Sequence, residues 1–276
     1  MSGVAMEQKI SGNSSREKRP SRKEILEKKK AIEEAIKASS ANKDHLASFP
    51  SLRHYNRNGL SVYLESGCGD KLSSSLKHFI QSLLKINMEG PYGSEWPSEE
   101  KVKRREMVAP EARYIVVHDA TANSKETLEM SERGRTNAWN INNNCPVVGF
   151  VHYRFTLEEE LPVVYVYEIQ LQSHVQGKGL GKFLMQLIEI IAQKNRMSAV
   201  MLTVQKANSS AMNFYLSKLS YNISAISPSR RFKLDFTVQL QMGYKKSYEI
   251  LCKILDSEAK AKLEVCTISI CYLVIL

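Results

Sequence analysis

The chain of 276 residues is long enough to bury one sizeable core, and with 43% hydrophobic and 25% charged residues it has the composition of a globular protein. Its five cysteines and six histidines are scattered, without CxxC or HExxH spacing, which argues against a disulfide framework or a zinc module and favours a reducing compartment. The formal net charge of +10 leaves open whether the basic residues face nucleic acid, solvent or another part of the protein.

Basic residues are concentrated in the stretch REKRPSRKEILEKKK. The apolar residues between Arg22 and Ala38 fall partly at helical spacing, so residues 1–40 are predicted to form a loose basic tail and a helix that docks on the rest of the protein. Nuclear import is compatible with such a tail, whereas direct nucleic-acid binding is not favoured, because no aromatic residue is interleaved with the charges. We expect no secretory leader and no membrane span, since the apolar stretch VCTISICYLVIL is too short to cross a bilayer.

Residues 41–144 are predicted to contain two strands and two helices. Asn58-Gly59 marks a turn before the strand-like segment LSVYLES. SSSLKHFIQSLLKINM is an amphipathic helix whose serines can cap its start, and a second helix is predicted from Ser98. ARYIVVHD is predicted to be a strand, and residues 120–144 a long polar loop.

The next segments alternate between strands and helices. PVVGFVHYRFTL and PVVYVYEIQLQ are two predicted strands joined by the acidic turn EEEL. A helix from Leu180 to near Asn195, the strand SAVMLTV, a helix from Ser209 to Leu219 and a strand at YNISAIS follow. This order predicts an α/β domain over residues 41–256, with a mixed central sheet of about seven strands and helices on both faces. Within it, residues 230–246 are predicted to be an insertion with no obvious place. Residues 257–276 are a C-terminal tail whose structure the sequence leaves open, and its last twelve residues are either a late strand or a tail foreign to the domain.

Three glycines separate the strand PVVYVYEIQLQ from the helix that begins at Leu180. Gln176, Gly179 and Gly181 fit the pattern Q/R-x-x-G-x-G/A, which is a weak signal by itself, because a tight strand-to-helix turn also favours glycine. Glycines let the backbone approach a ligand closely, and the first amides of a helix point outward without partners. With the helix dipole they form an anion site suited to a pyrophosphate.

A second segment, ANSSAMNFY, places Asn208, Ala211 and Tyr215 near one face at the start of a helix. The glycine turn, the helix, the strand and this segment together resemble the GCN5-related N-acetyltransferase (GNAT) superfamily. The resemblance implies the GNAT fold and acetyl-coenzyme A as cosubstrate, without a metal. It also implies that the pyrophosphate lies on the glycine turn and the pantetheine against a strand that splays from its parallel neighbour.

Six short matches narrow the resemblance: RNGL, SEW, YVYEIQLQ, GKGLGKF, MLTV and SYEIL occur in the order typical of the NatD-type N-alpha-acetyltransferases. Over residues 22–256 this resemblance implies acetylation of the terminal serine of histone four and histone two-A, by a monomer without auxiliary subunit, in nucleus and cytoplasm. The catalytic residues that it implies are Glu168, Tyr165, Tyr167 and Tyr215. Those implied to hold the cosubstrate are Ile169, Gln170, Leu171, Gln176, Gly177, Lys178, Gly179, Leu180, Gly181, Lys182 and Asn208. Those implied to hold the peptide are Tyr92, Trp96, Glu158, Tyr167, Thr203 and Tyr248.

The candidate general base is Glu168, because an α-amine must lose a proton before its nitrogen attacks a thioester. The ordinary pKa of that amine, about 7.7–8.0, makes this a modest task. Tyr215 is either the acid that protonates the departing thiolate or a core residue. Strict strand alternation places Tyr165 and Tyr167 on the face opposite Glu168. All three can line one channel only if the strand carries a β-bulge or the tyrosines reach across an edge, and the resemblance to the GNAT superfamily implies a bulge here. The alternative is that Glu168 is a salt-bridged structural residue.

A chain of net charge +10 should repel a basic histone tail. We therefore expect a local acidic mouth built from Glu158, Glu159 and Glu160, with Asp119 as a further candidate, although EEE is also an ordinary solvated turn. Thr156 stands where the resembling animal enzymes have an acidic residue, which puts part of the substrate grip in doubt.

Two other functions stay open at this point. One is a GNAT enzyme that acetylates lysine side chains or small amines. The other is a non-catalytic module, either a basic chromatin-binding protein or a cofactor-binding scaffold, which would require a broken site.

Overall fold

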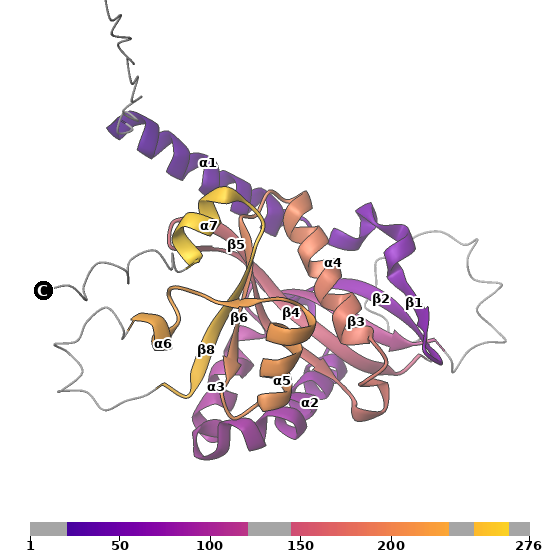
Figure 1. Cartoon of the computed structure of the whole chain (residues 1–276). Helices are drawn as coiled ribbons and strands as arrows, with labels where there is room; N and C mark the ends of the chain where they lie inside the picture. Colours follow the sequence, from indigo (N-terminus) through magenta and orange to yellow (C-terminus); the bar gives the residue numbers. More distant parts are fainter. Residues whose placement is uncertain (1–20, 121–144, 232–245, 265–276) are drawn as a thin grey trace, which may run out of the picture.

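Eight strands form one open, twisted sheet in the order β1-β2-β3-β4-β5-β6-β8-β7 (Figure 1). The structure is a computed structural model and describes residues 21–120, 145–231 and 246–264. The strands are β1 His54–Arg57, β2 Leu60–Cys68, β3 Arg113–Asp119, β4 Val147–Glu158, β5 Leu161–Leu171, β6 Ala199–Gln205, β7 Asn222–Ile223 and β8 Tyr248–Ile254. This confirms the predicted mixed sheet between helices and adds β1, which was not predicted.

The hairpin of β1 and β2 turns at Asn58 and Gly59, which both have positive φ, of 55° and 67°. Two such residues in sequence match the right-handed twist of the flanking strands. The turn was therefore predicted correctly. β1 escaped notice because only Tyr55 of its four residues is buried, so that the strand carries almost no apolar pattern.

Two helical layers cover the sheet. Helices α2 (Ser74–Tyr92) and α3 (Trp96–Glu106) pack on the face that carries Tyr114, Val116 and Phe150. Helix α4 (Leu180–Lys194) packs on the other face, against Ile115, Val117 and Val151. Residues one apart along a strand thus face different helices, as the two-residue period of a strand requires.

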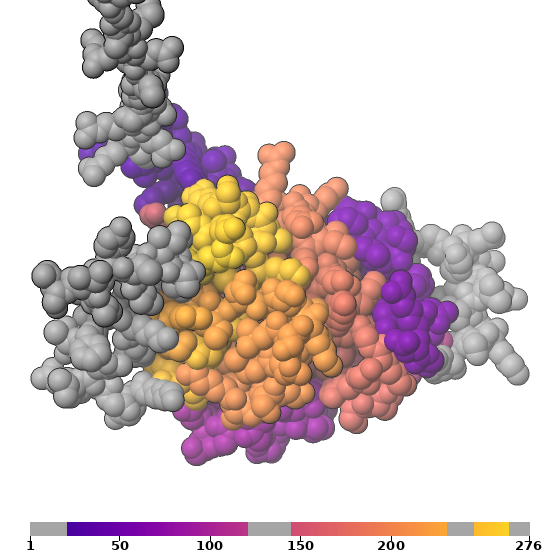
Figure 2. Space-filling model, viewed as in Figure 1, coloured from indigo at the N-terminus to yellow at the C-terminus, as the bar shows by residue number. Residues whose placement is uncertain are grey.

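Two further segments lie beside α4 and along the sheet. The short helix α5 (Ser209–Asn213) continues as the π-helical turn Phe214–Lys218, whose surface lies next to that of α4 in Figure 2. Helix α7 (Ser257–Leu263) buries Ala259 and Leu263 against β5, β6 and β8. The start of the segment 257–276, whose structure the sequence left open, is thus part of the packed domain.

The predicted N-terminal helix is present as α1 (Arg22–Ala41), and Ser21 and Glu24 form a capping box at its start. Its second half lies on the sheet through Ile36, while Ile25 and Leu26 in its first half stay exposed. Lys28 pairs with Glu258 of α7, and Lys29 with Glu160 of the β4–β5 turn. These pairs are largely exposed and contribute little stability each.

His45 ties the end of α1 to the core. Its ring lies in hydrogen-bond distance of the Ser39 carbonyl, 3.0 Å, and of the Tyr153 hydroxyl, 3.1 Å. Burial lowers the pKa of His45 to about 4. His45 is therefore protonated less readily in the folded state than in the unfolded chain. Its contribution to the free energy of unfolding is fully present above the ordinary pKa of 6.5 and is lost as the pH falls toward 4.

Between pH 7 and pH 5, we expect the free energy of unfolding of the native chain to fall by about 2 kcal/mol more than that of His45→Gln. Urea titrations of both proteins at the two pH values measure this difference. Gln can keep the bond to Ser39 but does not titrate. An equal pH dependence of the two proteins would show that His45 is not responsible.

Several predicted segments lie outside the described residues: the basic tail 1–20, the loop residues 121–144, most of the insertion 230–246, and residues 265–276. The predicted strand YNISAIS is shorter than expected, with only Asn222 and Ile223 paired to β8. Among the helices that are described, none combines the length and apolar character of a membrane span.

Candidate active site

A bulge in β5 decides which side chains meet. His152 of β4 lies opposite Glu168, but the next residue, Tyr153, lies opposite Val166, so Tyr167 is the extra residue. The expected bulge is thus confirmed. It places Glu168 on the same face of the sheet as Tyr165 and Tyr167, and it turns Ile169 toward the core under α4.

Next to the bulge, β5 and β6 separate. Their parallel pairing covers only four residue pairs, from Val163 with Ala199 to Val166 with Leu202. β5 runs on to Leu171 and β6 to Gln205, without register partners in one another along the rest of these described strands. Backbone groups of β5 beyond Val166 therefore face an opening in the sheet, which is where the pantetheine was predicted to lie.

A cavity of about 80 Å³ occupies this opening. It brings together nearly all the side chains that were assigned to catalysis from the sequence, except Tyr165. Its polar lining residues are Tyr92, Lys103, Tyr167, Glu168, Gln170, Thr203, Gln205, Asn208 and Tyr215.

The carboxylate of Glu168 is 8% exposed and both of its oxygens accept hydrogen bonds. Lys103 Nζ donates to Oε1 in a buried ion pair, and Gln170 Nε2 donates to Oε2 at 2.9 Å. Gln170 in turn accepts from Asn87 of α2 at 3.0 Å. Glu168 is therefore both salt-bridged and part of a cavity wall, so the two sequence-based alternatives for this residue are not exclusive.

Lys103 is 12% exposed, and it keeps its charge in spite of this burial. Desolvation lowers its pKa, but the negative charge of Glu168 and the neighbouring Tyr92 outweigh it, so that the pKa is raised. The Tyr92 ring centroid lies 5.4 Å from Lys103 Nζ. Lys103 was not predicted from the sequence, because one lysine in the run EEKVKRRE carries no signal that it points inward.

Tyr215 lies across the cavity from the strand, in the π-helical turn. It is 6% exposed, and burial, with the charge of Glu168, raises the pKa of its hydroxyl. The phenol is therefore held in its protonated form. Single π-helical turns occur frequently at functional sites, where they reorient a side chain.

The glycine turn has the geometry of an anion site. Gly177 and Gly179 have φ of 72° and 86°, and no side chain of the described residues caps the start of α4. The first intrahelical bond from this end is donated by Phe183 to Gly179, which leaves the amides of residues 180–182 without helical partners. Tyr55 donates to the Lys178 carbonyl at 2.6 Å, so the turn is fixed from β1.

Helix α5 and the residues after it connect the glycine turn with the cavity. Asn208 caps α5 by accepting from Ala211 at 3.0 Å, and both residues line the cavity. Phe214, next to Tyr215, approaches the position where Gly181 would carry a Cβ to 3.4 Å. Gln176 donates to the Leu171 carbonyl at 2.9 Å and so connects the turn to the end of β5.

A second group of predicted residues surrounds Tyr165. Its hydroxyl lies 2.6 Å from Thr203, and its ring lies 5.5 Å from that of Tyr167. Burial raises the pKa of Tyr165 to about 12, and the charges of Glu158 and Tyr248 act on it in the same direction. Four of the residues assigned to the peptide, Tyr167, Glu158, Thr203 and Tyr248, are therefore near Tyr165.

Trp96 and the acidic mouth differ from expectation. Trp96 is 3% exposed and packs in the core under α2, with its ring centroid 5.9 Å from that of Tyr92. It does not line the cavity. Glu160 pairs with Lys29 and Lys262, so its charge is balanced by two cations.

Asp119 is excluded from the mouth, because it ends β3 beside the start of β4, whereas Glu158 is the last residue of β4. His118, beside Asp119, lies opposite Val147, eleven strand positions from Glu158, or roughly 36 Å at 3.3 Å per residue. The carboxylates whose charges reach Tyr167 are Glu106, Glu158 and Glu111. Glu106 and Glu111 could not be found from the sequence, because they precede β3 and come close only in the fold.

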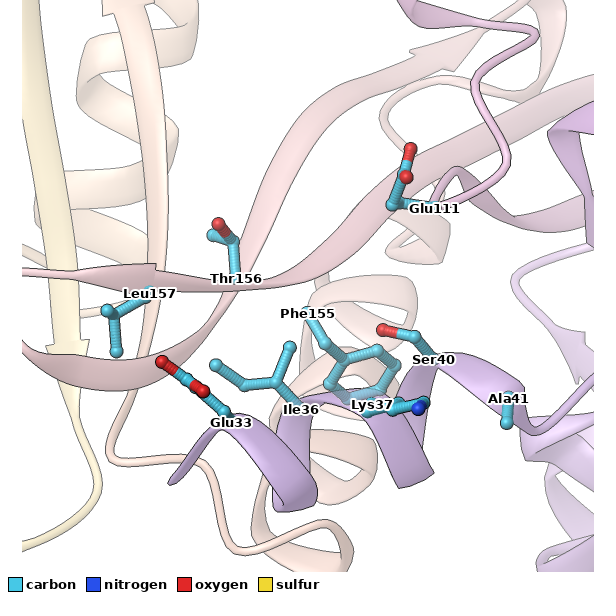
Figure 3. A pocket seen from close by; sticks show the side chains of 9 residues that line it. All are labelled: Glu33, Ile36, Lys37, Ser40, Ala41, Glu111, Phe155, Thr156 and Leu157. Atoms are coloured by element: carbon cyan, nitrogen blue, oxygen red, sulfur yellow. The ribbon is translucent and has the colours of Figure 1, made fainter. Parts of the chain in front are cut away.

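A larger cavity, of about 560 Å³, lies between α1 and β4 (Figure 3). Ile36 and Phe155 form part of its apolar wall. Its polar groups belong to Glu33, Lys37, Ser40, Glu111 and Thr156 (Figure 3). The charge of Glu111, which lines this cavity, also acts on the Tyr167 hydroxyl. One end of the larger cavity therefore lies near the aromatic residues of the candidate site. Within the described ranges, no group of three or more His, Cys, Asp or Glu residues is placed to hold a metal ion.

Comparison with known proteins finds a family match and similar solved structures. Residues 92–221, slightly less than half of the chain, match the model of the acetyltransferase (GNAT) family. PaiA N-acetyltransferase from Thermoplasma acidophilum, solved with coenzyme A, is 13% identical, covering 71% of this chain and 100% of its own, with a TM-score of 0.43.

Two N-terminal acetyltransferase structures match comparably. The NatC complex bound to Gag peptide and CoA is 16% identical, covering 70% of this chain and 99% of that chain, with a TM-score of 0.40. Arabidopsis thaliana Naa50 in complex with the bisubstrate analogue CoA-Ac-MVNAL is 14% identical, covering 70% and 99%, with a TM-score of 0.39.

Proposed function

We propose that the chain carries an acetyltransferase domain of the GNAT family and that it acetylates the free N-terminal amine of a protein, in particular the terminal serine of histone four and histone two-A. One observation carries the proposal: the opening between β5 and β6 coincides with the bulge that turns Glu168 into a cavity beside two aromatic side chains. We also propose that the enzyme occurs in nucleus and cytoplasm, together with its histone substrates.

The residues present fit acetyl-coenzyme A. The glycine turn and the uncapped amides of α4 would hold its pyrophosphate, and the unpaired part of β5, Ile169 to Leu171, would face its pantetheine. When bound, acetyl-coenzyme A supplies an acetyl group activated as a thioester.

The residues of the chain would position the amine and move its protons. A chain terminus entering past Tyr165 and Tyr167 would bring its nitrogen to Glu168, which accepts the proton that this nitrogen loses, directly or through a water. Tyr215, held protonated, faces the same cavity and would donate a proton to the departing thiolate.

The charge near the aromatic wall suits a basic peptide in spite of the chain's net charge of +10. The carboxylates of Glu106, Glu111 and Glu158 and one cation, Arg154, act on Tyr167, so acidic groups outnumber basic ones around this ring. Complementary charge of this kind favours encounter with a cationic tail.

Tyr215→Phe is expected to lower kcat by about 10- to 100-fold, because the phenol is the proton donor, while the KM for acetyl-coenzyme A stays unchanged. Steady-state kinetics on a histone peptide measure both constants. Phe keeps the ring in the core, so Tm serves as the control. An unchanged kcat would show that Tyr215 only packs.

Mass spectrometry of a Ser-Gly-Arg-Gly peptide incubated with protein and acetyl-coenzyme A tests the proposed function. We expect one acetyl group on the α-amine, no product when that amine is blocked, and slower reaction of sequence-scrambled peptides. Acetylation of an internal lysine in an α-blocked peptide would favour the lysine acetyltransferase instead. Equal rates on scrambled peptides would refute histone specificity.

A further inference from the structure

We propose that Lys103 is a positioning residue that fixes the Glu168 carboxylate and balances its charge. As a result, the cavity binds the amine that receives the acetyl group in its uncharged form. The inference deepens the proposed function and rests on it. It starts from the ion pair of Lys103 with Glu168, which connects α3 to the bulge of β5.

The first step is orientation. Glu168 receives one donor on each oxygen, Lys103 on Oε1 and Gln170 on Oε2 at 2.9 Å. Asn87 donates to Gln170 at 3.0 Å and also to the Leu171 carbonyl at 3.2 Å. The carboxylate is therefore held by a chain of bonds from α2 and α3, and only its remaining lone pairs face the cavity.

The second step is charge. The titratable groups around Glu168 come from every element packed on it: Lys103 and Glu106 of α3, Tyr92 of α2, Tyr114 of β3, His152 of β4 and Tyr215 of the π-helical turn. Burial raises the pKa of the three tyrosines and lowers that of His152, so these four are uncharged.

Two charged groups remain beside the pair. Burial raises the pKa of Glu106, and the charges of Lys103 and then Arg154 oppose this change. Arg154 also lies over the Tyr167 ring at 4.3 Å and donates to the Glu106 carbonyl at 2.6 Å. Two acids, Glu168 and Glu106, thus lie beside two bases, Lys103 and Arg154, and the carboxylate that meets the amine already has its cation.

The third step concerns the amine. A carboxylate without a partner would attract a second cation, whereas one paired in a low-dielectric cavity gains little from an ammonium group that must also lose its water. The uncharged amine enters without that cost and can donate a hydrogen bond to Glu168. At pH 7.4 roughly a quarter of a peptide α-amine is uncharged, but only about a thousandth of a lysine side chain, since their pKa values are about 7.7–8.0 and 10.4. Charge balance at Lys103 therefore selects chain termini over lysines.

The test measures binding of a Ser-Gly-Arg-Gly peptide to the full chain in the presence of coenzyme A, which carries no acetyl group and allows no turnover. For the native protein we expect the Kd to tighten about tenfold between pH 6.5 and pH 8.5, as the amine loses its proton. In Lys103→Met the cavity contains an unbalanced carboxylate, so the Kd should stay level or weaken over the same range. Lys103→Arg, which keeps the charge, should show the native direction.

Controls separate this from other causes. Lys101→Met, on an exposed position of the same helix, should behave as the native chain, and an N-terminally acetylated peptide should bind without pH dependence. Lys103→Gln replaces Lys103→Met if thermal denaturation shows the latter unfolded. Native pH dependence in the charge-removing variant would overturn the role of Lys103 while leaving the proposed function intact. No acetylation of the peptide by the native protein would instead overturn the proposed function and this inference with it.

Discussion

Glu168→Gln is expected to lower kcat by at least about 100-fold, because the proton acceptor of the cavity is removed while its shape is kept. The same change leaves the Lys103 ammonium buried without its partner, and we expect the free energy of unfolding to fall by about 3 kcal/mol. Steady-state kinetics with a serine-starting histone peptide and urea unfolding measure the two effects.

The double variant Lys103→Met with Glu168→Gln separates chemistry from stability. Removing both charges of a buried pair is often neutral, so most of the lost free energy of unfolding should return. The activity should not. Turnover at the native rate in Glu168→Gln, or its recovery in the double variant, would show that Glu168 has a structural role only.

Gly179→Ala is expected to raise the KM for acetyl-coenzyme A by at least about tenfold. The alanine is strained in the left-handed conformation of this residue, and its Cβ also comes too close to a neighbouring side chain. Gly179 has φ of 86°, and a Cβ there would lie 2.8 Å from the Tyr55 hydroxyl. Tyr55 would have to move away from the Lys178 carbonyl, to which it donates at 2.6 Å, and the start of α4 would lose its support.

Gly177→Ala is the matched comparison, because φ is 72° at this position but no atom of the described residues lies within 4 Å of the place that a Cβ would take. It shares the backbone cost of about 1–2 kcal/mol and lacks the contact. We expect a clearly smaller rise of KM, with kcat unchanged in both variants. Equal KM values for the two variants and the native chain would mean that this turn does not hold the cosubstrate.

The segments with regular periodicity could be predicted from the sequence. The amphipathic helix α4 and the strands β4 and β5 were found because apolar residues repeat strongly along them, and the glycine turn because its residues are adjacent in sequence. Strand alternation conflicted with the required grouping of Tyr165, Tyr167 and Glu168, and the resemblance implied a bulge as the solution, but its position at Tyr167 came only from the structure.

The remainder depends on packing between distant segments. Lys103 reaches Glu168 from 65 residues away, and Glu106 and Glu111 reach Tyr167 through the same approach of α3 to β5. Trp96 was assigned to the peptide channel through the resemblance, but it is the first residue of α3 and packs in the core with residues of α2. Charge in EEE was visible, whereas the pairing of Glu160 with Lys29 and Lys262 requires α1 and α7 to be in place.

Hydrogen exchange in the presence and absence of saturating acetyl-coenzyme A tests most directly whether the opening between β5 and β6 receives the cosubstrate. We predict that the cosubstrate slows exchange of the amides in residues 167–171 and 177–182, while the amides of helix α7 exchange as before. Slowed exchange confined to other segments, or no change at all, would contradict this placement.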